Sequence, residues 1–281
     1  MKSVEGKIVL VTGAAMGMGR LYAQRAASEG AKAVVLWDVN AEALKATATE
    51  LSASHPRIVA HIVDVSSLAS IATAADRVRA EVGDPQVLIN NAGIVRAGYF
   101  WHHDPERDTE LSMRINAIAP MHIAREFLPA MIAGDGASRL LNIASAAGTL
   151  SNPKMSVYAA SKWAVIGWSD SLRLELAQAG HRHVAVTTLA PSYISTGMFE
   201  GVRGPLLTPI LAPDYVVDRA WAAMLAGRPL LMLPRAVGFA RALRGILPQR
   251  AFDFIAGRVF GVYRSMDDFT GRSSRSQTKK S

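Results

Sequence analysis

A short apolar run, a glycine-rich loop and a helical stretch near the N-terminus constrain the fold of this chain most strongly. Residues 8–11 are apolar and partly β-branched, which predicts a buried strand, and a helical pattern covers residues 20–28. Between them lie Gly13, Gly17, Met18 and Gly19. Glycine permits a sharp turn and a close approach of the backbone to a pyrophosphate, which the start of the following helix attracts. The loop therefore predicts a dinucleotide site, although a tight structural turn would need similar glycines.

Strand-like runs and helical stretches alternate along most of the chain. The strand-like runs are residues 8–11, 33–37, 58–63, 87–90, 139–144 and 184–189. This alternation predicts an α/β fold, a Rossmann-type doubly wound parallel sheet with helices on both faces. The 281 residues, half of them apolar, suffice for one large domain. We expect an NAD-binding catalytic domain over residues 1–227, a basic amphipathic helical extension of it over 228–270, and a disordered tail over 271–281.

The second strand-like run ends in Asp38, nineteen residues after Gly19. An acid at this position can accept hydrogen bonds from the adenosine ribose and would repel a 2′-phosphate. The nearest basic residues, Arg20 and Lys32, lie outside the glycine loop, where a cation could compensate a phosphate. The pattern favours NAD over NADP as the cofactor. The alternative is that Asp38 caps the helix that begins near residue 41.

Tyr158 and Lys162 are four residues apart, and Ser145 ends an apolar run thirteen residues upstream of the tyrosine. On a helix such a pair projects from one face, so the ammonium could favour the phenolate, whose ordinary pKa is about 10. Tyr158 could then exchange a proton near neutral pH, while the Ser145 hydroxyl holds a substrate oxygen. For the isolated pair, a chance contact is the alternative. A nucleophilic Ser145 is disfavoured because no nucleophile-elbow pattern surrounds it.

In order and approximate spacing, these motifs resemble the short-chain dehydrogenase/reductase family over roughly residues 4–227. The resemblance rests on Thr12, Gly13, Gly17, Gly19, Asp64, Asn90, Asn91, Ala92, Gly93, Asn116, Ser145, Tyr158, Lys162 and Pro191. It implies a hydride-transfer enzyme in which Tyr158 is the acid and base and Lys162 also bonds the nicotinamide ribose. Ser192 departs from the glycine that the family usually has after the proline.

The resemblance also gives roles to residues whose chemistry is not evident from the sequence. Asn116 would lie at a helix kink that holds a water for proton relay to Lys162. Asp64 could instead cap a helix starting near Ser67, and the amides and Gly93 could be structural. The remaining expected cofactor contacts are Asp64 and Val65 at the adenine, Asn91, Ala92 and Gly93 at the adenosine ribose and neighbouring cofactor, and Ile194 and Thr196 at the nicotinamide carboxamide.

Other features of the composition exclude several classes of protein. The chain has no cysteine, its first residues do not form a signal peptide, and no apolar stretch approaches the roughly 20 residues of a membrane span. We therefore expect a cytoplasmic protein, with a peripheral position at a membrane surface still open. The histidine pairs at 102–103 and 181–183 lack a third suitably spaced ligand, so we expect surface histidines and no metal. A substrate-binding role for the first pair stays open.

The segments around the expected site are apolar, which bears on the substrate. Apolar walls select apolar ligands, because burying hydrocarbon contributes about 25 cal/mol per Å² whereas an unpaired polar group is costly to bury. We therefore expect a lipophilic secondary or allylic alcohol, or its ketone or aldehyde, as the substrate. The side chains that could form such walls, or could only pack a lid, are Tyr99, Phe100, Leu150, Tyr193, Leu206 and Leu207.

The whole net charge lies in the C-terminal part. Residues 228–281 hold eleven Lys and Arg against three Asp, whereas residues 1–227 hold twenty basic and twenty acidic residues. Two apolar patterns of helical period, separated by Pro248, predict two basic amphipathic helices within residues 235–262. They could pack on the core, cover the substrate mouth or contact an anionic membrane. Nucleic acid is not expected, because no binding module is recognisable.

The C-terminal part also refines the resemblance. Leu247, Pro248 and Arg250 before an apolar run, together with Asp38 after Leu36 and Trp37, are similar to the retinol and 17β-hydroxysteroid dehydrogenase branch of the family. A homodimer through the helices that contain Asn116 and Tyr158 is expected, with a homotetramer as the alternative. The same fold could also serve an NAD-binding sensor or a membrane-surface scaffold. The specific substrate and the physiological direction of the reaction are not determined by the sequence.

Overall fold

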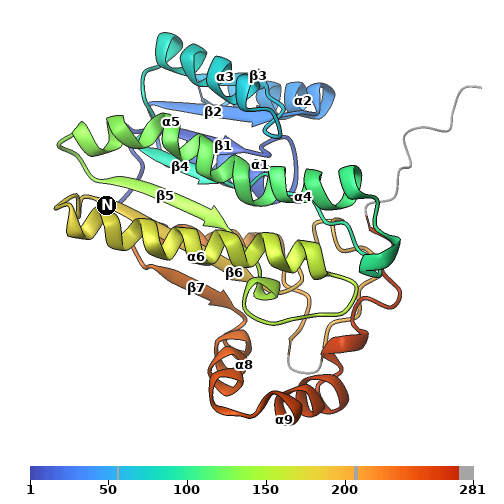
Figure 1. The fold of residues 1–281 in the computed structure, drawn as a ribbon. Helices are drawn as coiled ribbons and strands as arrows, with labels where there is room; N and C mark the ends of the chain where they lie inside the picture. Colours follow the sequence, from blue (N-terminus) through green and yellow to red (C-terminus); the bar gives the residue numbers. More distant parts are fainter. Residues whose placement is uncertain (56, 206–207, 272–281) are drawn as a thin grey trace, which may run out of the picture.

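A seven-stranded parallel sheet forms the centre of the computed structural model, which describes residues 1–55, 57–205 and 208–271. The strand order is β3-β2-β1-β4-β5-β6-β7, and all six neighbouring pairs are parallel (Figure 1). This confirms the predicted Rossmann-type fold. The strands are β1 (Ile8–Thr12), β2 (Ala33–Asp38), β3 (Ile58–Ile62), β4 (Val87–Asn90), β5 (Ser138–Ile143), β6 (Val184–Pro191) and β7 (Leu230–Leu233).

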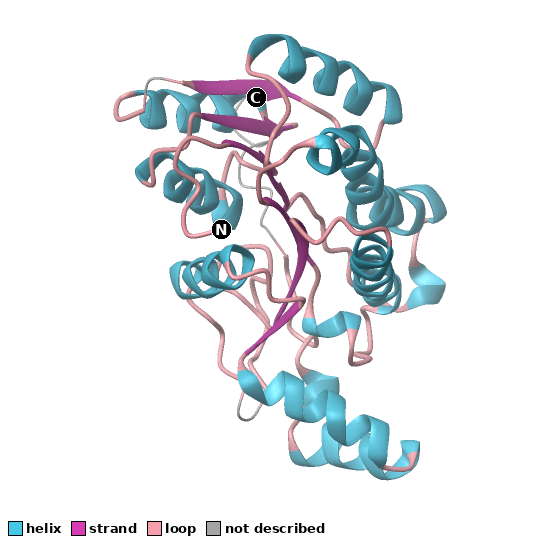
Figure 2. Ribbon diagram, turned by 90° about the vertical axis from the view of Figure 1, so that its left-hand side faces the viewer, coloured by secondary structure: helices cyan, strands magenta, loops and turns pink. Residues whose placement is uncertain are grey.

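Helices cover both faces of the sheet (Figure 2). The helices on one face are α1 (Gly17–Ser28), α2 (Ala41–Ser52) and α7 (Pro213–Leu225), and those on the other are α3 (Leu68–Glu81), α5 (Ala119–Ala133) and α6 (Ser156–Gln178). Alternate strand residues enter the two layers: Val9 and Val11 pack with the first set of helices, and Ile8 and Leu10 with the second. Because both faces are covered, the strands are apolar on both sides, as expected for a parallel sheet.

The seventh strand was absent from the sequence-based prediction. Residues 230–233 lie between Pro229 and Pro234, and their short apolar run shows no alternation that would separate a strand from a loop. β7 pairs with β6 at the edge of the sheet. The sheet domain therefore continues past residue 227, and the appended helices begin only at residue 235.

The segment that leads into α5 is a helix with widened turns. It starts with a π-helical stretch at Pro105–Glu110, continues through α4 (Leu111–Met113) and has a second π-helical turn at Arg114–Ile118. Asn116 lies in that second turn. π-Helical turns bend a helix and are common at functional sites. The structure thus places Asn116 at an irregularity in a long helix, as the family resemblance implies.

The C-terminal extension consists of the two predicted helices. They are α8 (Arg235–Ile246) and α9 (Gln249–Phe254), with Pro248 between them and a π-helical turn at Ile255–Val259 after the second. The two helices project beyond β7, at the bottom of Figure 1. No helix within the described ranges is both long and apolar enough to cross a membrane.

Side chains of the extension hold the loop that precedes α6. Arg244 donates to the Thr149 carbonyl at 2.8 Å, and its guanidinium lies 5.3 Å from the centre of the Trp163 ring. Further along, the Lys154 ammonium pairs with Asp267 at 2.7 Å. The extension therefore supports the loop between Ser145 and α6, several residues of which line a pocket described below.

Candidate active site

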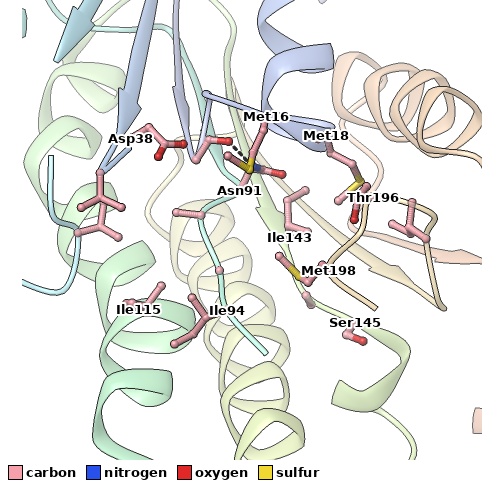
Figure 3. A pocket seen from close by; sticks show the side chains of 18 of the residues that line it. Met16, Met18, Asp38, Asn91, Ile94, Ile115, Ile143, Ser145, Thr196 and Met198 are labelled. Carbon is pink, nitrogen blue, oxygen red and sulfur yellow. Dashed lines mark hydrogen bonds between the residues drawn. The ribbon is translucent and has the colours of Figure 1, made fainter. Parts of the chain in front are cut away.

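One pocket at the carboxyl ends of the strands collects nearly all of the predicted site residues. Its cavity has a volume of about 350 Å³. Asp38 and Ser145 lie toward opposite ends, with Asn91 and Ile143 between them (Figure 3). Gly19 and Asn116 lie behind its wall. The predicted residues that line it are Gly13, Gly17, Met18, Asp38, Asp64, Val65, Asn91, Ala92, Gly93, Ser145, Tyr158, Lys162, Ile194 and Thr196.

The glycine loop has the geometry that its sequence predicts. Gly13 and Gly17 have φ values of +63° and +56°, a conformation that other residues rarely adopt. A Cβ on Gly19 would lie 1.9 Å from the Gly13 carbonyl oxygen, so only glycine allows α1 to pack this closely on the loop. The Asn91 side chain donates to the carbonyls of Thr12 at 3.0 Å and Gly13 at 3.2 Å. The loop is thus held open at the start of α1, where a pyrophosphate would bind.

Asp38 orders the adenosine end of the pocket. Its carboxylate accepts the N–H of Ala15 in the glycine loop and the N–H of Asn40, both at 2.9 Å. Asn40, and not Asp38, caps α2 by accepting the N–H of Ala43 at 3.1 Å. The capping alternative for Asp38 is therefore wrong. The carboxylate remains within the pocket lining, where it can meet ribose hydroxyls.

Asp64 makes a similar local turn at the end of β3. Its carboxylate accepts the backbone N–H of Ser66 at 2.9 Å and the hydroxyl of the same residue at 2.7 Å. Ser67 is the residue that caps α3, through the N–H of Ser70. Asp64 and Val65 lie on the same pocket lining as Asp38, where the adenine is expected.

Asn116 connects the segment after β4 to α6. Its carbonyl oxygen accepts the N–H of Ile94 at 2.8 Å, and its amide nitrogen donates to the Ile94 carbonyl at 2.9 Å and to the Ser161 hydroxyl at 3.2 Å. Gly93 lies next to this contact, since a Cβ there would be 3.2 Å from the Asn116 oxygen and 3.6 Å from the Lys162 ammonium. Asn116 thereby positions the backbone next to Lys162 without lining the pocket itself.

Asn90 has the structural role that its position predicts. Its side chain is buried, and it donates to Asn142 on β5 at 2.9 Å and to the Pro120 carbonyl at 3.3 Å. Asn142 in turn donates to the Ser169 hydroxyl on α6 at 2.9 Å. This buried chain of hydrogen bonds ties the two central strands to α6.

Tyr158, Lys162 and Ser145 meet in the buried part of the pocket. The Lys162 ammonium lies 5.8 Å from the centre of the Tyr158 ring and donates to the Ile143 carbonyl at 2.9 Å. Ser145 follows β5, and its hydroxyl oxygen accepts the N–H of Ala147 at 3.2 Å. All three side chains are nearly fully buried. The arrangement can exchange a proton with a ligand oxygen held between the serine and the tyrosine.

Burial is the main cause of the pKa shifts of Tyr158 and Lys162. It raises the pKa of Tyr158 to about 12, while a hydrogen bond with Ser145 acts in the opposite direction. It also lowers the pKa of Lys162 to about 8. The expected lowering of the tyrosine pKa by Lys162 is therefore not found in this structure, because burial is the largest influence and Lys162 is not among the groups that shift this pKa.

A second pocket, here called the side pocket, opens beside Ser145. Leu150 and Tyr193 contribute to it as predicted, whereas Tyr99 and Phe100 are exposed on the surface and do not line it. The predicted wall residues Leu206 and Leu207 lie outside the described residues. Further lining residues that the sequence did not indicate are Asn152, Met155, Phe199, Val237 and Val262. Most of these walls are apolar, and the C-terminal extension supplies one of them.

The two histidine pairs noted in the sequence, at 102–103 and 181–183, line neither of these two pockets. His102 is exposed, and His103, His181 and His183 are partly buried. His183 contacts the Met131 carbonyl at 3.2 Å. Within residues 1–55, 57–205 and 208–271, no three acidic or histidine side chains are grouped as they would be around a metal ion.

The sheet order, the glycine loop and the buried tyrosine and lysine together define a nucleotide-binding oxidoreductase. The family model described as short chain dehydrogenase matches residues 7–205. The chain belongs to the short-chain dehydrogenase family.

Relatives and solved structures agree with this assignment. Epidermal retinol dehydrogenase 2 of Mus musculus is 39% identical over 98% of this chain and 88% of its own. Estradiol 17-beta-dehydrogenase 11 of Homo sapiens is 36% identical over 89% of this chain and 82% of its own. These names confirm the predicted branch.

Two solved structures of the family have the same fold. A short chain dehydrogenase/reductase from Burkholderia phymatum in complex with NAD has a TM-score of 0.80 and 28% identity, over 88% of this chain and 95% of its own. One from Sphingobium yanoikuyae in complex with NADPH has a TM-score of 0.73 and 27% identity, over 86% of this chain and 97% of its own. The two neighbours differ in cofactor, so the fold alone does not decide between NAD and NADP.

The raised pKa of Tyr158 predicts a pH dependence that differs between the two directions of reaction. Well below a pKa of about 12, the phenolate fraction rises with pH while the phenol fraction stays near one. For alcohol oxidation, kcat/KM should therefore rise about tenfold per pH unit between roughly pH 5 and 7, where Lys162 is still largely charged. For carbonyl reduction it should stay flat over that range. Steady-state rates in both directions test this, and a plateau of oxidation below pH 7 would contradict it.

Proposed function

We propose that this protein is an NAD-dependent dehydrogenase that interconverts a lipophilic secondary or allylic alcohol and its ketone or aldehyde. The observation that carries the proposal is the position of Ser145. This residue lines both the pocket that holds the glycine loop, Tyr158 and Lys162, and the largely apolar side pocket. A hydrocarbon bound in the side pocket would thus present its oxygen to the proton-transfer groups. The names of the relatives, which refer to retinol and estradiol, support a substrate of this class.

The buried side chains divide the proton-transfer chemistry between them. Ser145 donates a hydrogen bond to the substrate oxygen and so orients it, while Tyr158 takes the hydroxyl proton in oxidation and returns it in reduction. Lys162, held at the Ile143 carbonyl, supplies positive charge near the phenol. Phe199 packs edge-on against the Tyr158 ring, with centres 6.2 Å apart, and helps to exclude water from the phenol. Asn116 keeps the backbone beside Lys162 in place.

The pocket fits a nicotinamide dinucleotide, which would accept or supply the hydride when bound. The glycine loop would offer the start of α1 to the pyrophosphate, and the Asp38 carboxylate, which lines the same pocket, would meet the adenosine ribose. Ile194 and Thr196 line the same pocket and would meet the carboxamide. The choice of NAD over NADP rests on Asp38. Arg20, one of the nearest cations, is already paired with Glu50.

A non-catalytic NAD-binding sensor is the alternative on the same fold. Such a protein would need the glycine loop and Asp38, but it would have no use for a buried Tyr158 beside Lys162 and Ser145. Burying these ionisable groups is costly, as their shifted pKa values indicate. A catalytic function accounts for this cost, because the groups then react with a substrate. The buried groups therefore favour an enzyme over a sensor.

We also propose that the C-terminal extension contacts an anionic membrane surface. Phe239 and Ile246 on α8 are 71% and 79% exposed, and Phe254 on α9 is 60% exposed. Apolar side chains this exposed on adjacent helices are typical of a contact surface. The opposite side of the extension already lines the side pocket through Val237 and Val262.

The charges of the extension point to the chemistry of its partner. Arg235, Arg241, Arg250 and Arg258 are all exposed, and none forms an ion pair with another described residue. Each arginine near an anionic bilayer contributes about 1 kcal/mol of attraction. The same two helices therefore combine free positive charge with exposed apolar side chains, which is the pattern of an interfacial amphipathic helix. A membrane-surface scaffold would need only this surface. In an enzyme, the same surface would bring the active site close to lipophilic substrates in the membrane.

The helices that carry the site also leave apolar side chains exposed. Ile118, Trp163 and Leu174 lie on or beside α5 and α6 and are between 40% and 54% exposed. These side chains support the homodimer through the two helices, which stays a prediction, with a homotetramer as its alternative.

Removing the Tyr158 hydroxyl tests the reaction. Tyr158→Phe keeps the ring and its packing but loses the hydroxyl, so kcat/KM for oxidation should fall by about 10²-fold or more. NADH formation would be measured over retinoids, steroids and long-chain alcohols, and NADH binding by fluorescence should be retained. The assignment fails if wild type oxidises none of these alcohols, or if the variant is as fast as wild type.

The cofactor preference should depend on the charge of Asp38. Asp38→Asn removes the repulsion of a 2′-phosphate, so the ratio of kcat/KM with NAD to that with NADP should fall by about tenfold or more. Asp64→Asn is a matched control, because it removes a carboxylate from the same pocket and should change the ratio little. A wild type that prefers NADP, or an equal change in both variants, would contradict the assignment.

Membrane contact can be measured by co-sedimentation with vesicles. Wild type should bind phosphatidylcholine vesicles that contain phosphatidylserine, bind pure phosphatidylcholine weakly, and dissociate as salt rises. Replacing Phe239 and Ile246 together by serine should weaken binding about tenfold or more. Leu68→Ser changes an exposed leucine on α3 and should bind as wild type does. Equal binding to both kinds of vesicle, or an unaffected double variant, would contradict the proposal.

A further inference from the structure

The loop that follows β6 extends along the main pocket, which the glycine loop and Tyr158 also line, and it reaches the glycine loop itself. Thr196 lies against the glycine loop (Figure 3), since a Cβ on Gly17 would be 3.7 Å from its side chain. Residues 194–203 are here called the crossing loop. The members of this loop that line the main pocket are Ile194, Thr196, Met198 and Phe199.

The last described residues of the chain are bonded to this loop. The Glu200 carbonyl oxygen accepts the backbone N–H of Thr270 at 3.0 Å and the hydroxyl of the same residue at 3.2 Å. Nearby, the backbone N–H of Arg203 donates to the Ser265 carbonyl at 3.2 Å. Residues 265–271, here called the strap, are therefore tied to the crossing loop at both of their ends.

A glycine in the crossing loop makes this contact possible. Gly201 has a φ of +84°, and a Cβ there would lie 2.1 Å from the carbonyl oxygen of Asp268 in the strap. No Cβ can approach an oxygen so closely, so with any other residue the strap or the loop would have to move. The contact between the two segments therefore requires glycine at this position.

Apolar side chains of both segments pack together around Tyr158. Val202 of the crossing loop and Met266 of the strap are buried, and they belong to one cluster with the tyrosine. Phe199 and Phe269 pack against the same cluster. Because this apolar surface is removed from water only while the strap lies on the loop, its burial favours the closed arrangement.

The strap also lies next to the main pocket. Phe269 and Thr270 line a small cavity together with Gly93, Ile94 and Met198. The last three residues line the main pocket as well. The strap is thus placed where its movement would change access to the pocket.

We propose that the strap holds the crossing loop closed over the nicotinamide part of the main pocket, and that the loop opens for cofactor exchange only when the strap detaches. The strap thereby sets the rate at which the cofactor leaves, a step that limits turnover in many enzymes. The inference rests on the proposed nicotinamide cofactor, and it requires no particular alcohol. A segment held by a few hydrogen bonds near the surface can open locally while the sheet stays folded.

Gly201→Ala tests the proposal by forcing the strap and the loop apart where they meet. In the full-length protein, the dissociation rate of NADH should rise about tenfold or more, because the loop is no longer held closed. The rate is measured by displacing bound NADH with excess NAD and following the loss of NADH fluorescence. An unchanged dissociation rate overturns the inference.

Gly180→Ala is the matched control. Gly180 follows α6, at the end of the helix remote from Tyr158, and has a φ of +87°. No atom lies within 4 Å of the position that its Cβ would take. The control thus has the backbone strain of Gly201→Ala without the collision, so it should be destabilised on heating but release NADH as wild type does. If both variants release NADH equally fast, the effect is a general loss of stability and the inference fails.

Hydrogen–deuterium exchange of the protein without cofactor tests whether the strap holds the loop. In Gly201→Ala the amides of residues 194–199 should exchange faster together with those of residues 268–271, whereas Gly180→Ala should leave both segments as in wild type. Faster exchange in the strap alone would mean that other contacts hold the loop, which contradicts the inference.

These measurements use no alcohol, so their outcome is separate from that of the proposed reaction. Strap-dependent release of NADH supports the inference even if no alcohol in the panel is oxidised. Conversely, alcohol oxidation by a wild type whose NADH release and amide exchange do not respond to Gly201→Ala would remove the inference and leave the proposed function intact.

Discussion

The parallel arrangement of all seven strands is the constraint on which the site depends. It brings every strand's carboxyl end to one edge of the sheet, and the chain leaves β1 and β4 toward opposite faces, so that a crevice opens between them. Thr12 and Asn91 hold this point together, because the Thr12 hydroxyl accepts the N–H groups of Asn91 and Ala92, both at 3.0 Å. The glycine loop, the tyrosine and the lysine lie around the opening that these few bonds maintain.

Most of the fold could be predicted from the sequence, because the sequence patterns that specify it are local. Six strands, the glycine turn and both C-terminal helices could be predicted from apolar runs and from the spacing of apolar residues within windows of about fifteen residues. β7 was not predicted, because its four consecutive apolar residues between two prolines show no alternation that would indicate a strand. Asn152 and Ser265 were missed for a different reason: they are separated by 113 residues, and neither has a sequence context that predicts the other. Contacts of this kind depend on how the extension packs, which no local pattern describes.

The electrostatics of the site illustrate the same limit. A lysine one helical turn from a tyrosine predicts a lowered tyrosine pKa, and the spacing was correct. The structure adds the depth at which both groups lie, and burial changes the direction of the shift for Tyr158 and lowers the pKa of Lys162. Sequence indicates which charges are near each other, but the cost of removing them from water depends on the completed fold.

The attachment of α8 and α9 to the loop before α6 separates chemistry from recognition. The residues proposed to transfer the proton lie on α6 and directly after β5, whereas Val237 and Val262 of the extension line the side pocket. The extension is tied to the loop before α6 through Arg244 and Ser265. Replacements within the extension can therefore reshape the cavity without moving the reacting groups. Under the proposed function the chain would in this sense be modular: the sheet and α6 would carry the reaction, and the appended segment would shape the cavity that admits the substrate.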